Sequence, residues 1–225
     1  MSVAIVTGSS RGLGRALAAE LLARGWTVVG DARGAAALAE ATGGHERAIA
    51  VPGDVSDAGH RAALVAAAGE RIDLLVNNAS ALGPSPQPPL GHYPLDVLRH
   101  VYEVDVIAPV ALVQLALPRM RADGVIINVS SDAAVEAYEG WGGYGSAKAA
   151  LDQVTAVLAA EHPGLRVYAV DPGDMRTQLH QEAFPDEDIS DRPPPEESVP
   201  GLIALIEGAL PSGRYRAREL SGVRV

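Results

Sequence analysis

The sequence contains no cysteine, which excludes disulfides, thiolate zinc sites and cysteine nucleophiles. Lysine is almost as scarce, because Lys148 is the only lysine among the 18 basic residues. There is no basic run, and the formal charge of -10 argues against nucleic acid and against anionic membrane surfaces as partners. The sequence predicts no metal site. A small molecule is therefore the expected partner.

The sequence also lacks a recognisable targeting or membrane-spanning pattern. Residues 1–7 are too few and wrongly flanked for a signal peptide, and we expect no apolar run to span a bilayer. We therefore expect a cytoplasmic protein. Its 225 residues, 48% hydrophobic and 20% charged, fit one soluble domain with a large core.

Short apolar runs alternate with helical patterns along the whole chain. Strands are predicted at 3–7, 27–30, 47–51, 72–76, 125–129 and 166–170, with a short final strand within 214–225. Helices are predicted at 15–24, 35–41, from an N-cap at Ser56 to about residue 69, within 95–120, at 144–161 and at 199–210. This order predicts an α/β protein with one domain over residues 1–225: a single Rossmann-type, doubly wound parallel sheet with helices on both faces.

The first predicted strand runs into a glycine-rich turn that opens the first helix, Thr7-Gly8-Ser9-Ser10-Arg11-Gly12-Leu13-Gly14. Glycines suit this position because a Cβ would block both the turn and the approach of a pyrophosphate. Backbone N–H groups and a helix N-terminus then meet at one point, as in phosphate sites. The turn predicts a dinucleotide site, with a tight turn that binds no ligand as the alternative.

Tyr144 is followed four residues later by Lys148 in a predicted helix, so the two side chains share a face. An ammonium stabilises a phenolate and is expected to lower the pKa of Tyr144 from its ordinary value of about 10. Such a phenol suits general acid/base catalysis. A chance pairing on a solvated helix is the alternative. Tyr138 has no cation four residues on, and with Trp141 it is expected in a pocket wall.

Two irregular segments are expected beside the ligand edge of the sheet. Residues 81–94 contain five prolines and form a stiff loop, and residues 174–200 form a charged, proline-rich flap. We expect both to form the substrate pocket, with a solvated insertion as the alternative for the flap. Its candidate lining residues are Met175, Leu179, His180 and Phe184.

These motifs, in this order, resemble the classical short-chain dehydrogenase/reductase family over nearly the whole chain. The resemblance implies a nicotinamide dinucleotide held by Gly8, Ser10, Arg11, Gly12, Leu13, Gly14, Arg33, Asp54, Val55, Asn77, Ala79, Tyr144, Lys148, Pro172, Gly173 and Thr177. It implies that Ser131 hydrogen-bonds the substrate oxygen, Tyr144 transfers the proton and Lys148 holds ribose hydroxyls. The neighbouring Ser130 is expected to point to the opposite face of its strand.

The sequence departs from that family at two positions. Ser80 replaces its sheet-edge glycine, and Asp105 stands at the position of its catalytic asparagine, which acts largely through a main-chain carbonyl. Pro109 cannot donate to the Asp105 carbonyl, so we expect this carbonyl, and a water relay to Lys148, to persist. If the carboxylate faces Lys148 instead, it would pair with the ammonium and weaken its effect on Tyr144.

The cofactor prediction depends on residues 31–33, at the end of the second predicted strand. By the family's count, Ala32 occupies the position of the NAD-selecting acid, and Arg33 the next position, typical of NADP-dependent members. Arg11 favours a phosphate too, whereas Asp31 could repel it. We therefore expect NADP(H), with NAD(H) as the alternative.

The activity implied is reduction of a carbonyl, or oxidation of the matching alcohol, of a small or medium organic molecule. Imine reduction, epimerase or dehydratase chemistry without net redox change, and a non-catalytic dinucleotide sensor are the alternatives. Apolar residues around much of helices 95–120 and 144–161 favour a homodimer or homotetramer.

Overall fold

The computed structural model of the chain describes residues 2–220 and 222. Seven parallel strands form one sheet in the order β3-β2-β1-β4-β5-β6-β7. They are β1 (Val3–Val6), β2 (Thr27–Ala32), β3 (Ala48–Pro52), β4 (Ile72–Asn77), β5 (Met120–Val129), β6 (Arg166–Asp171) and β7 (Gly213–Arg216). The strand order reverses between β1 and β4, which is the switch point where such sheets bind ligands. The predicted fold class is confirmed.

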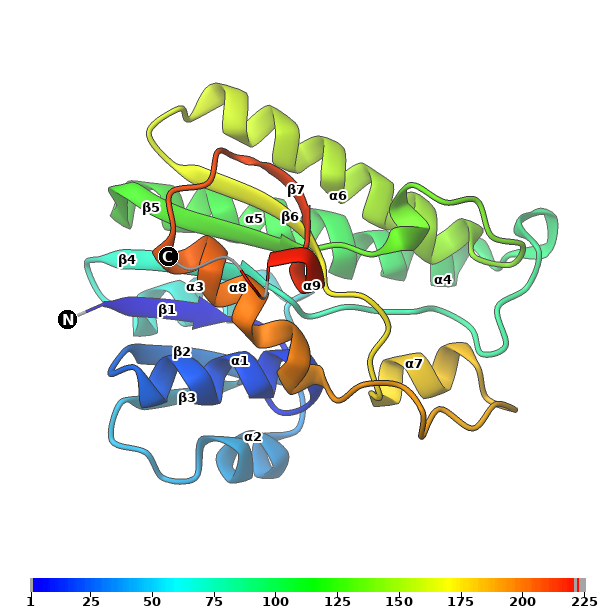
Figure 1. Cartoon of the computed structure of the whole chain (residues 1–225), viewed down its shortest axis with the longest axis horizontal. Helices are drawn as coiled ribbons and strands as arrows, with labels where there is room; N and C mark the ends of the chain where they lie inside the picture. Colours follow the sequence, from blue (N-terminus) through cyan, green and yellow to red (C-terminus); the bar gives the residue numbers. More distant parts are fainter. Residues whose placement is uncertain (1, 221, 223–225) are drawn as a thin grey trace.

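Helices cover both faces of the sheet (Figure 1). They are α1 (Gly12–Ala23), α2 (Ala35–Thr42), α3 (Ala58–Ala67), α4 (Leu95–Tyr102), α5 (Ala108–Ala116), α6 (Gly142–Glu161), α7 (Gln178–Ala183), α8 (Val199–Glu207) and α9 (Ala217–Leu220). Alternate strand residues point to opposite faces. Ala4 and Val6 therefore join the core with α1 and α8, whereas Ile5 joins the core with α3 and α5.

One helical run, Leu95–Arg119, is long and apolar enough by length and composition to cross a membrane, contrary to the expectation from sequence. Half of its most apolar window is buried inside the protein, and α5 contributes Leu112 and Val113 to the core against the sheet. This burial is typical of a core helix in a doubly wound fold.

A π-helical turn, Glu103–Ile107, joins α4 to α5. Pro109 has no N–H, and in a regular α-helix its ring would clash with the carbonyl of Asp105. The turn is wider instead, with the N–H of Ala108 bonded to the carbonyl of Glu103. Single π turns of this kind occur often at functional sites, and this one carries Asp105.

Most predicted element boundaries differ from the structure by a few residues, and three of the differences lie at the N-cap of α3, at the start of α6 and near the end of the chain. Asp57, not Ser56, caps α3, because its side chain accepts the N–H of His60. Helix α6 begins two residues before Tyr144. The predicted final strand spans only Gly213–Arg216 and leads into α9, while residues 221 and 223–225 lie outside the described part.

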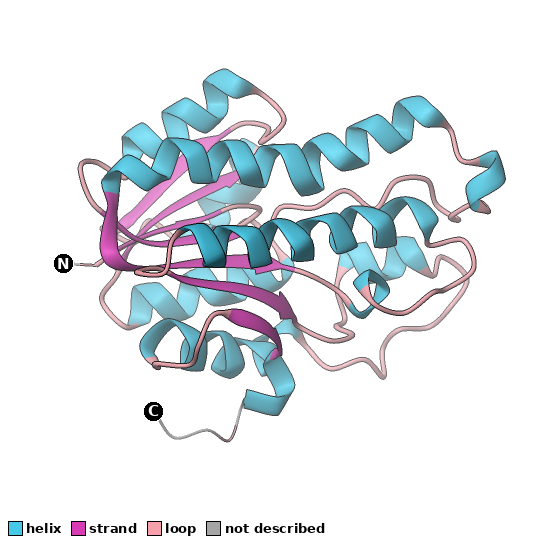
Figure 2. Ribbon diagram, turned by 90° about the horizontal axis from the view of Figure 1, so that it is seen from above, coloured by secondary structure: helices cyan, strands magenta, loops and turns pink. Residues whose placement is uncertain are grey.

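The loops that follow the strands gather at one end of the sheet, where all the strands terminate (Figure 2). Helix α7 and the flap around it lie at this same end (Figure 1). Because the strands are parallel, residues that follow β1, β4, β5 and β6 in the sequence come together there. These are the segments in which the sequence predicts the site.

Candidate active site

The glycine-rich turn lies between β1 and α1. Gly8 and Gly12 have φ values of 67° and 55°, in the left-handed region that favours glycine. A Cβ on Gly14 would lie 2.4 Å from the carbonyl oxygen of Gly8. Arg11, the N-cap residue of α1, makes no side-chain cap bond, so the positive end of this helix can accept an anion. The turn therefore fits a pyrophosphate.

Residues at the end of β4 hold this turn in place. The hydroxyl of Thr7 accepts the N–H groups of Asn78 and Ala79, each at 2.9 Å, and the Asn78 amide donates to the Thr7 carbonyl at 2.8 Å. The side chain of Asn77, included among the predicted cofactor contacts, donates at 2.8 Å to buried Asn128 within the sheet instead. Strand alternation could have identified Asn78 as the residue that faces the turn.

Asp31 anchors the same turn from β2. Asp31 is 1% exposed, and its side chain accepts the N–H of Gly8 at 2.7 Å and lies 3.0 Å from Nε2 of His60 on α3. Burial raises the pKa of Asp31, against the lowering effect of the hydrogen bonds from His60 and Gly8. The sequence suggested that Asp31 could repel a phosphate, but its carboxylate is directed into the protein.

The other predicted contacts of the adenosine end lie around the ends of β2 and β3. Arg33 is exposed, and Val55 is buried against Val104. Burial tends to raise the pKa of Asp54, but hydrogen bonds from Ser56 and the charge of Arg33 lower it below its usual range.

In the flap, the predicted cofactor-binding residue Thr177 lies close to the glycine-rich turn. Arg11 is exposed and donates to the side chain of Gln178 on α7. A Cβ on Gly12 would lie 3.4 Å from the methyl group of Thr177. The flap therefore meets the glycine-rich turn directly.

The predicted catalytic residues come together on α6 and at the end of β5. Tyr144 and Lys148 are 6% and 2% exposed, and the Lys148 ammonium lies 5.4 Å from the centre of the Tyr144 ring. The ammonium also donates to the carbonyl of Val129 at 3.0 Å. The hydroxyl of Ser131 donates to Asp132 at 2.9 Å. Ser130 and Ser131 both line a cavity beside Tyr144, and Ser130 is the more deeply buried of the two.

The carboxylate of Asp105 faces Lys148, the second of the two arrangements that the sequence left open. Its Oδ1 lies 3.0 Å from the Lys148 ammonium and also accepts the hydroxyl of Ser80. Its Oδ2 accepts the N–H of Ala81 at 3.1 Å. Asp105 and Lys148 therefore form a buried ion pair, and the expected water relay from the Asp105 carbonyl stays a prediction.

This pairing changes the electrostatics of Tyr144. Burial raises the pKa of Tyr144; Lys148 lowers it, Asp105 raises it again, and hydrogen bonds with Ser80 and Ser131 lower it. The net direction is upward, so the predicted net lowering of the Tyr144 pKa is wrong: Lys148 does lower it, but desolvation outweighs the ammonium. Burial lowers the pKa of Lys148, but Asp105 and Tyr144 raise it above its usual value. At neutral pH the pair is a phenol and an ammonium.

A cavity of about 330 Å³ lies beside Tyr144. Its lining includes the predicted pocket and nicotinamide-side residues Tyr138, Trp141, Pro172, Gly173, Met175, Thr177, Leu179, His180 and Phe184. The indole of Trp141 contacts Tyr144 and Phe184, with ring centres 5.8 and 5.7 Å apart. The loop 81–94 does not line this cavity; it lies behind the wall, where Leu82 packs with Tyr144.

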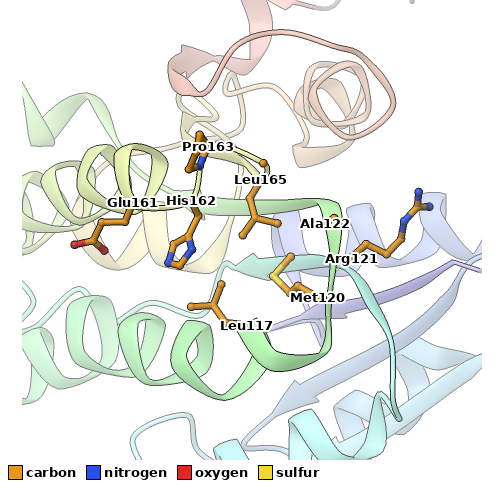
Figure 3. Close-up of a pocket in the computed structure, with 9 residues that line it drawn as sticks. Leu117, Met120, Arg121, Ala122, Glu161, His162, Pro163 and Leu165 are labelled. Atoms are coloured by element: carbon orange, nitrogen blue, oxygen red, sulfur yellow. The ribbon is translucent and has the colours of Figure 1, made fainter.

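A second hollow, of about 320 Å³, lies at the end of the sheet where the strands begin. Figure 3 shows the residues that line it. Its lining includes Met120, where β5 begins, and Leu165, just before β6. The predicted catalytic residues lie near the ends of the strands, so this hollow is separate from them.

The sequence did not identify Arg214 on β7. Its guanidinium donates to Asp152 and to the carbonyl of Ser131, both at 2.9 Å, and lies 3.6 Å from Asp171. Arg214 therefore positions the backbone of the predicted catalytic serine. It belongs to no recognisable motif, so only the sheet order reveals its role.

At the switch point a glycine-rich turn that fits a pyrophosphate lies near a cavity lined by Tyr144 and Ser131, with Lys148 beside Tyr144. This combination is typical of a dinucleotide-dependent enzyme. Residues 2–188 match the family model for short chain dehydrogenases. The chain is 30% identical over 232 residues to an uncharacterized oxidoreductase of Saccharomyces cerevisiae, covering 98% of this chain and 91% of that protein. It is 36% identical over 191 residues to 2-(R)-hydroxypropyl-CoM dehydrogenase of Xanthobacter autotrophicus, covering 80% and 76%.

The structure is also similar to an Escherichia coli CFT073 protein solved in complex with NADPH, with a TM-score of 0.88, 26% identity and 96% of each chain covered. The chain therefore belongs to the short-chain dehydrogenase family, whose members are oxidoreductases that bind NAD(P).

Proposed function

We propose that this protein is an NADPH-dependent reductase that converts a carbonyl group into an alcohol, with Tyr144 as the proton donor. The observation that carries this proposal is the position of Tyr144, which lines the cavity together with Ser131 and lies beside the Lys148 ammonium. Burial and Asp105 raise the pKa of Tyr144, which favours the protonated phenol. A phenol that keeps its proton at neutral pH can donate it to a carbonyl oxygen. Oxidation of an alcohol needs the phenolate as base, so this direction is expected to become faster as the pH rises.

The residues of the chain divide the reaction between them. A bound nicotinamide dinucleotide supplies the hydride. Ser131 hydrogen-bonds the carbonyl oxygen, and Tyr144 delivers its proton to the same oxygen. The Lys148 ammonium, held by Asp105 and by the Val129 carbonyl, stabilises the phenolate that remains.

The preference for NADPH is supported by the residues at the end of β2. Arg33 is exposed and can pair with a phosphate on the ribose. Asp31, the carboxylate that could oppose this charge, is buried and bonded to Gly8 and His60. The structurally similar Escherichia coli protein was solved with NADPH, which is consistent with this preference. We expect NAD(H) to bind more weakly.

The substrate cavity favours an uncharged, ring-sized molecule. Trp141, Leu179 and Phe184 give it apolar and aromatic walls. The acidic residues Asp132 and Asp174 belong to the same lining, and they disfavour anionic substrates. A small or medium ketone fits this combination of volume, apolar wall and charge.

A single-turnover experiment tests the activity. Enzyme loaded with NADPH is mixed with a panel of ketones, quinones and imines, and the NADPH absorbance is followed. We expect loss of absorbance with an uncharged cyclic ketone. Product without cofactor consumption would instead indicate an epimerase or dehydratase, and tight binding with neither change would indicate a sensor. Fluorescence titrations with NADPH and NADH test the cofactor, and equal affinity would contradict the preference.

We also propose a homodimer or homotetramer formed through the helices α4 to α6. Ile107, Leu115 and Val157 are exposed apolar side chains on this helical layer. Burying them between copies would remove apolar surface from water. Light scattering on the purified protein tests this; a monomer at micromolar concentration would contradict it.

A further inference from the structure

Ser80 and Asp105, the two departures from the family pattern, contact each other. The hydroxyl of Ser80 donates to Asp105 Oδ1, the oxygen that also lies 3.0 Å from the Lys148 ammonium. The N–H of Ala81 occupies the other oxygen at 3.1 Å. Asp105 therefore keeps two partners, one on each oxygen, even without the bond from Ser80.

Ser80 and Ser131 also act on Tyr144, because a hydrogen bond from each of them lowers the pKa of the phenol. The two serines come from different places: Ser131 lines the substrate cavity, whereas Ser80 follows β4 and is not among the residues that line it. Ser131 is thus placed to serve the substrate oxygen. Ser80 connects the Tyr144 oxygen to the Asp105–Lys148 pair.

We propose that Ser80 is a further catalytic residue of this proton transfer: its hydroxyl donates to Asp105 in the resting enzyme and turns to the Tyr144 oxygen once that oxygen has given up its proton. A serine hydroxyl has a single proton and rotates to suit its acceptor. A new phenolate is a strong acceptor, and Asp105 retains Lys148 and Ala81. No covalent bond forms or breaks at Ser80, so it only exchanges one hydrogen-bond acceptor for another.

This arrangement predicts opposite effects for two neighbouring substitutions. Ser80→Ala removes a donor that stabilises the phenolate, so the pKa of Tyr144 rises further. Asp105→Asn removes a negative charge that opposes the phenolate, so the pKa of Tyr144 falls.

The test is an optical titration of the tyrosine phenolate in the full chain, without substrate or cofactor. Spectra are recorded just after rapid pH jumps, before unfolding, and the signal of Tyr144→Phe is subtracted to isolate Tyr144. We expect the midpoint to move to higher pH in Ser80→Ala and to lower pH in Asp105→Asn. Ser80→Thr, which keeps the hydroxyl, should match the wild type.

Ser146→Ala is the matched control. Ser146 lies on α6 with Tyr144, but it is exposed and is bonded to Tyr102 and to the Gly143 carbonyl. It should leave the midpoint unchanged. If Ser80→Ala does not fold, Ser80→Gly serves as the second variant without a hydroxyl. An unchanged or lowered midpoint in the hydroxyl-free variant, or a Ser80→Thr variant that behaves like it, would overturn the proposal.

The inference rests on the proposed function for the direction of the reaction. Kinetic measurements separate a failure of the proposed function from a failure of the role of Ser80. Loss of a hydrogen bond to a charged group corresponds to a decrease in kcat/KM of about 10- to 100-fold in Ser80→Ala. If the midpoints shift as expected but no carbonyl compound consumes NADPH, the proposed function fails and the link between Ser80 and Tyr144 stands. If NADPH is consumed but Ser80→Ala retains the wild-type midpoint and kcat/KM, only the role of Ser80 fails.

Discussion

Two buried acidic residues, Asp31 and Asp105, which are 1% and 0% exposed, hold different parts of the site. Asp31 bonds to the backbone of Gly8 and to His60, so it fixes the shape of a turn. Asp105 pairs with Lys148 and accepts the hydroxyl of Ser80, so it sets the charge around Tyr144. The comparison shows that the partners of a buried acid, more than its burial, decide whether it supports geometry or proton transfer.

The largest expected effect is on the catalytic side. Tyr144→Phe keeps the ring that packs against Trp141 and removes only the hydroxyl. Because positioned general acids typically contribute about 10²- to 10⁴-fold, we expect kcat to fall by this amount. NADPH affinity, measured by fluorescence titration, should stay close to the wild-type value. Carbonyl reduction within tenfold of the wild-type rate would contradict the assignment of Tyr144.

The corresponding change on the cofactor side should affect binding and stability instead of the chemical step. Asp31→Ala leaves the N–H of Gly8 and the ring of His60 without their partner. We expect a loss of about 1–3 kcal/mol in the free energy of unfolding, measured in urea, together with weaker NADPH binding. At saturating NADPH, kcat should stay within a few-fold of the wild type. Asp186→Ala, in the exposed part of the flap, is the control.

A smaller effect is expected for Arg33→Ala, which separates the shape of the turn from its charge. Losing one partly solvated pair with a phosphate should weaken NADPH binding by about tenfold, equivalent to about 1.4 kcal/mol. NADH binding and the free energy of unfolding should not change. Parallel fluorescence titrations measure the ratio. An equal loss of affinity for both cofactors would mean that Arg33 does not contact the phosphate.

The smallest effect at neutral pH is expected for Asp105→Asn, but it changes the pH profile. Asp105 raises the pKa of Tyr144, so its removal lowers that pKa. The reduction needs the protonated phenol, and its rate falls as the pH rises through this pKa. The alkaline limb of the profile should therefore move to lower pH in the variant. An unchanged profile would mean that the carboxylate is not coupled to Tyr144.

The sequence was most informative where spacing along the chain determines the geometry. The glycine-rich turn and the Tyr144–Lys148 pair are local patterns, and the structure brings both together at the end of the sheet. The fold class followed from the alternation of strands and helices, because a parallel sheet needs such crossovers.

Contacts between distant side chains could not be predicted in the same way. His60 and Asp31 are 29 residues apart, and Arg214 and Ser131 are 83 residues apart. Their pairing depends on the strand order and on rotamers, which no local pattern encodes. The predicted direction of the Tyr144 pKa shift was wrong for a related reason. The sequence shows the nearest cation, but it does not show the desolvation that opposes the effect of this cation.

The ionisation state of Tyr144 tests the central claim most directly. Difference spectra between the wild type and Tyr144→Phe report this residue alone across a range of pH. We expect no phenolate signal at neutral pH, and a signal only above the ordinary tyrosine pKa of 10.0. A phenolate signal from Tyr144 at pH 7 would contradict the assignment of this residue as a proton donor for carbonyl reduction.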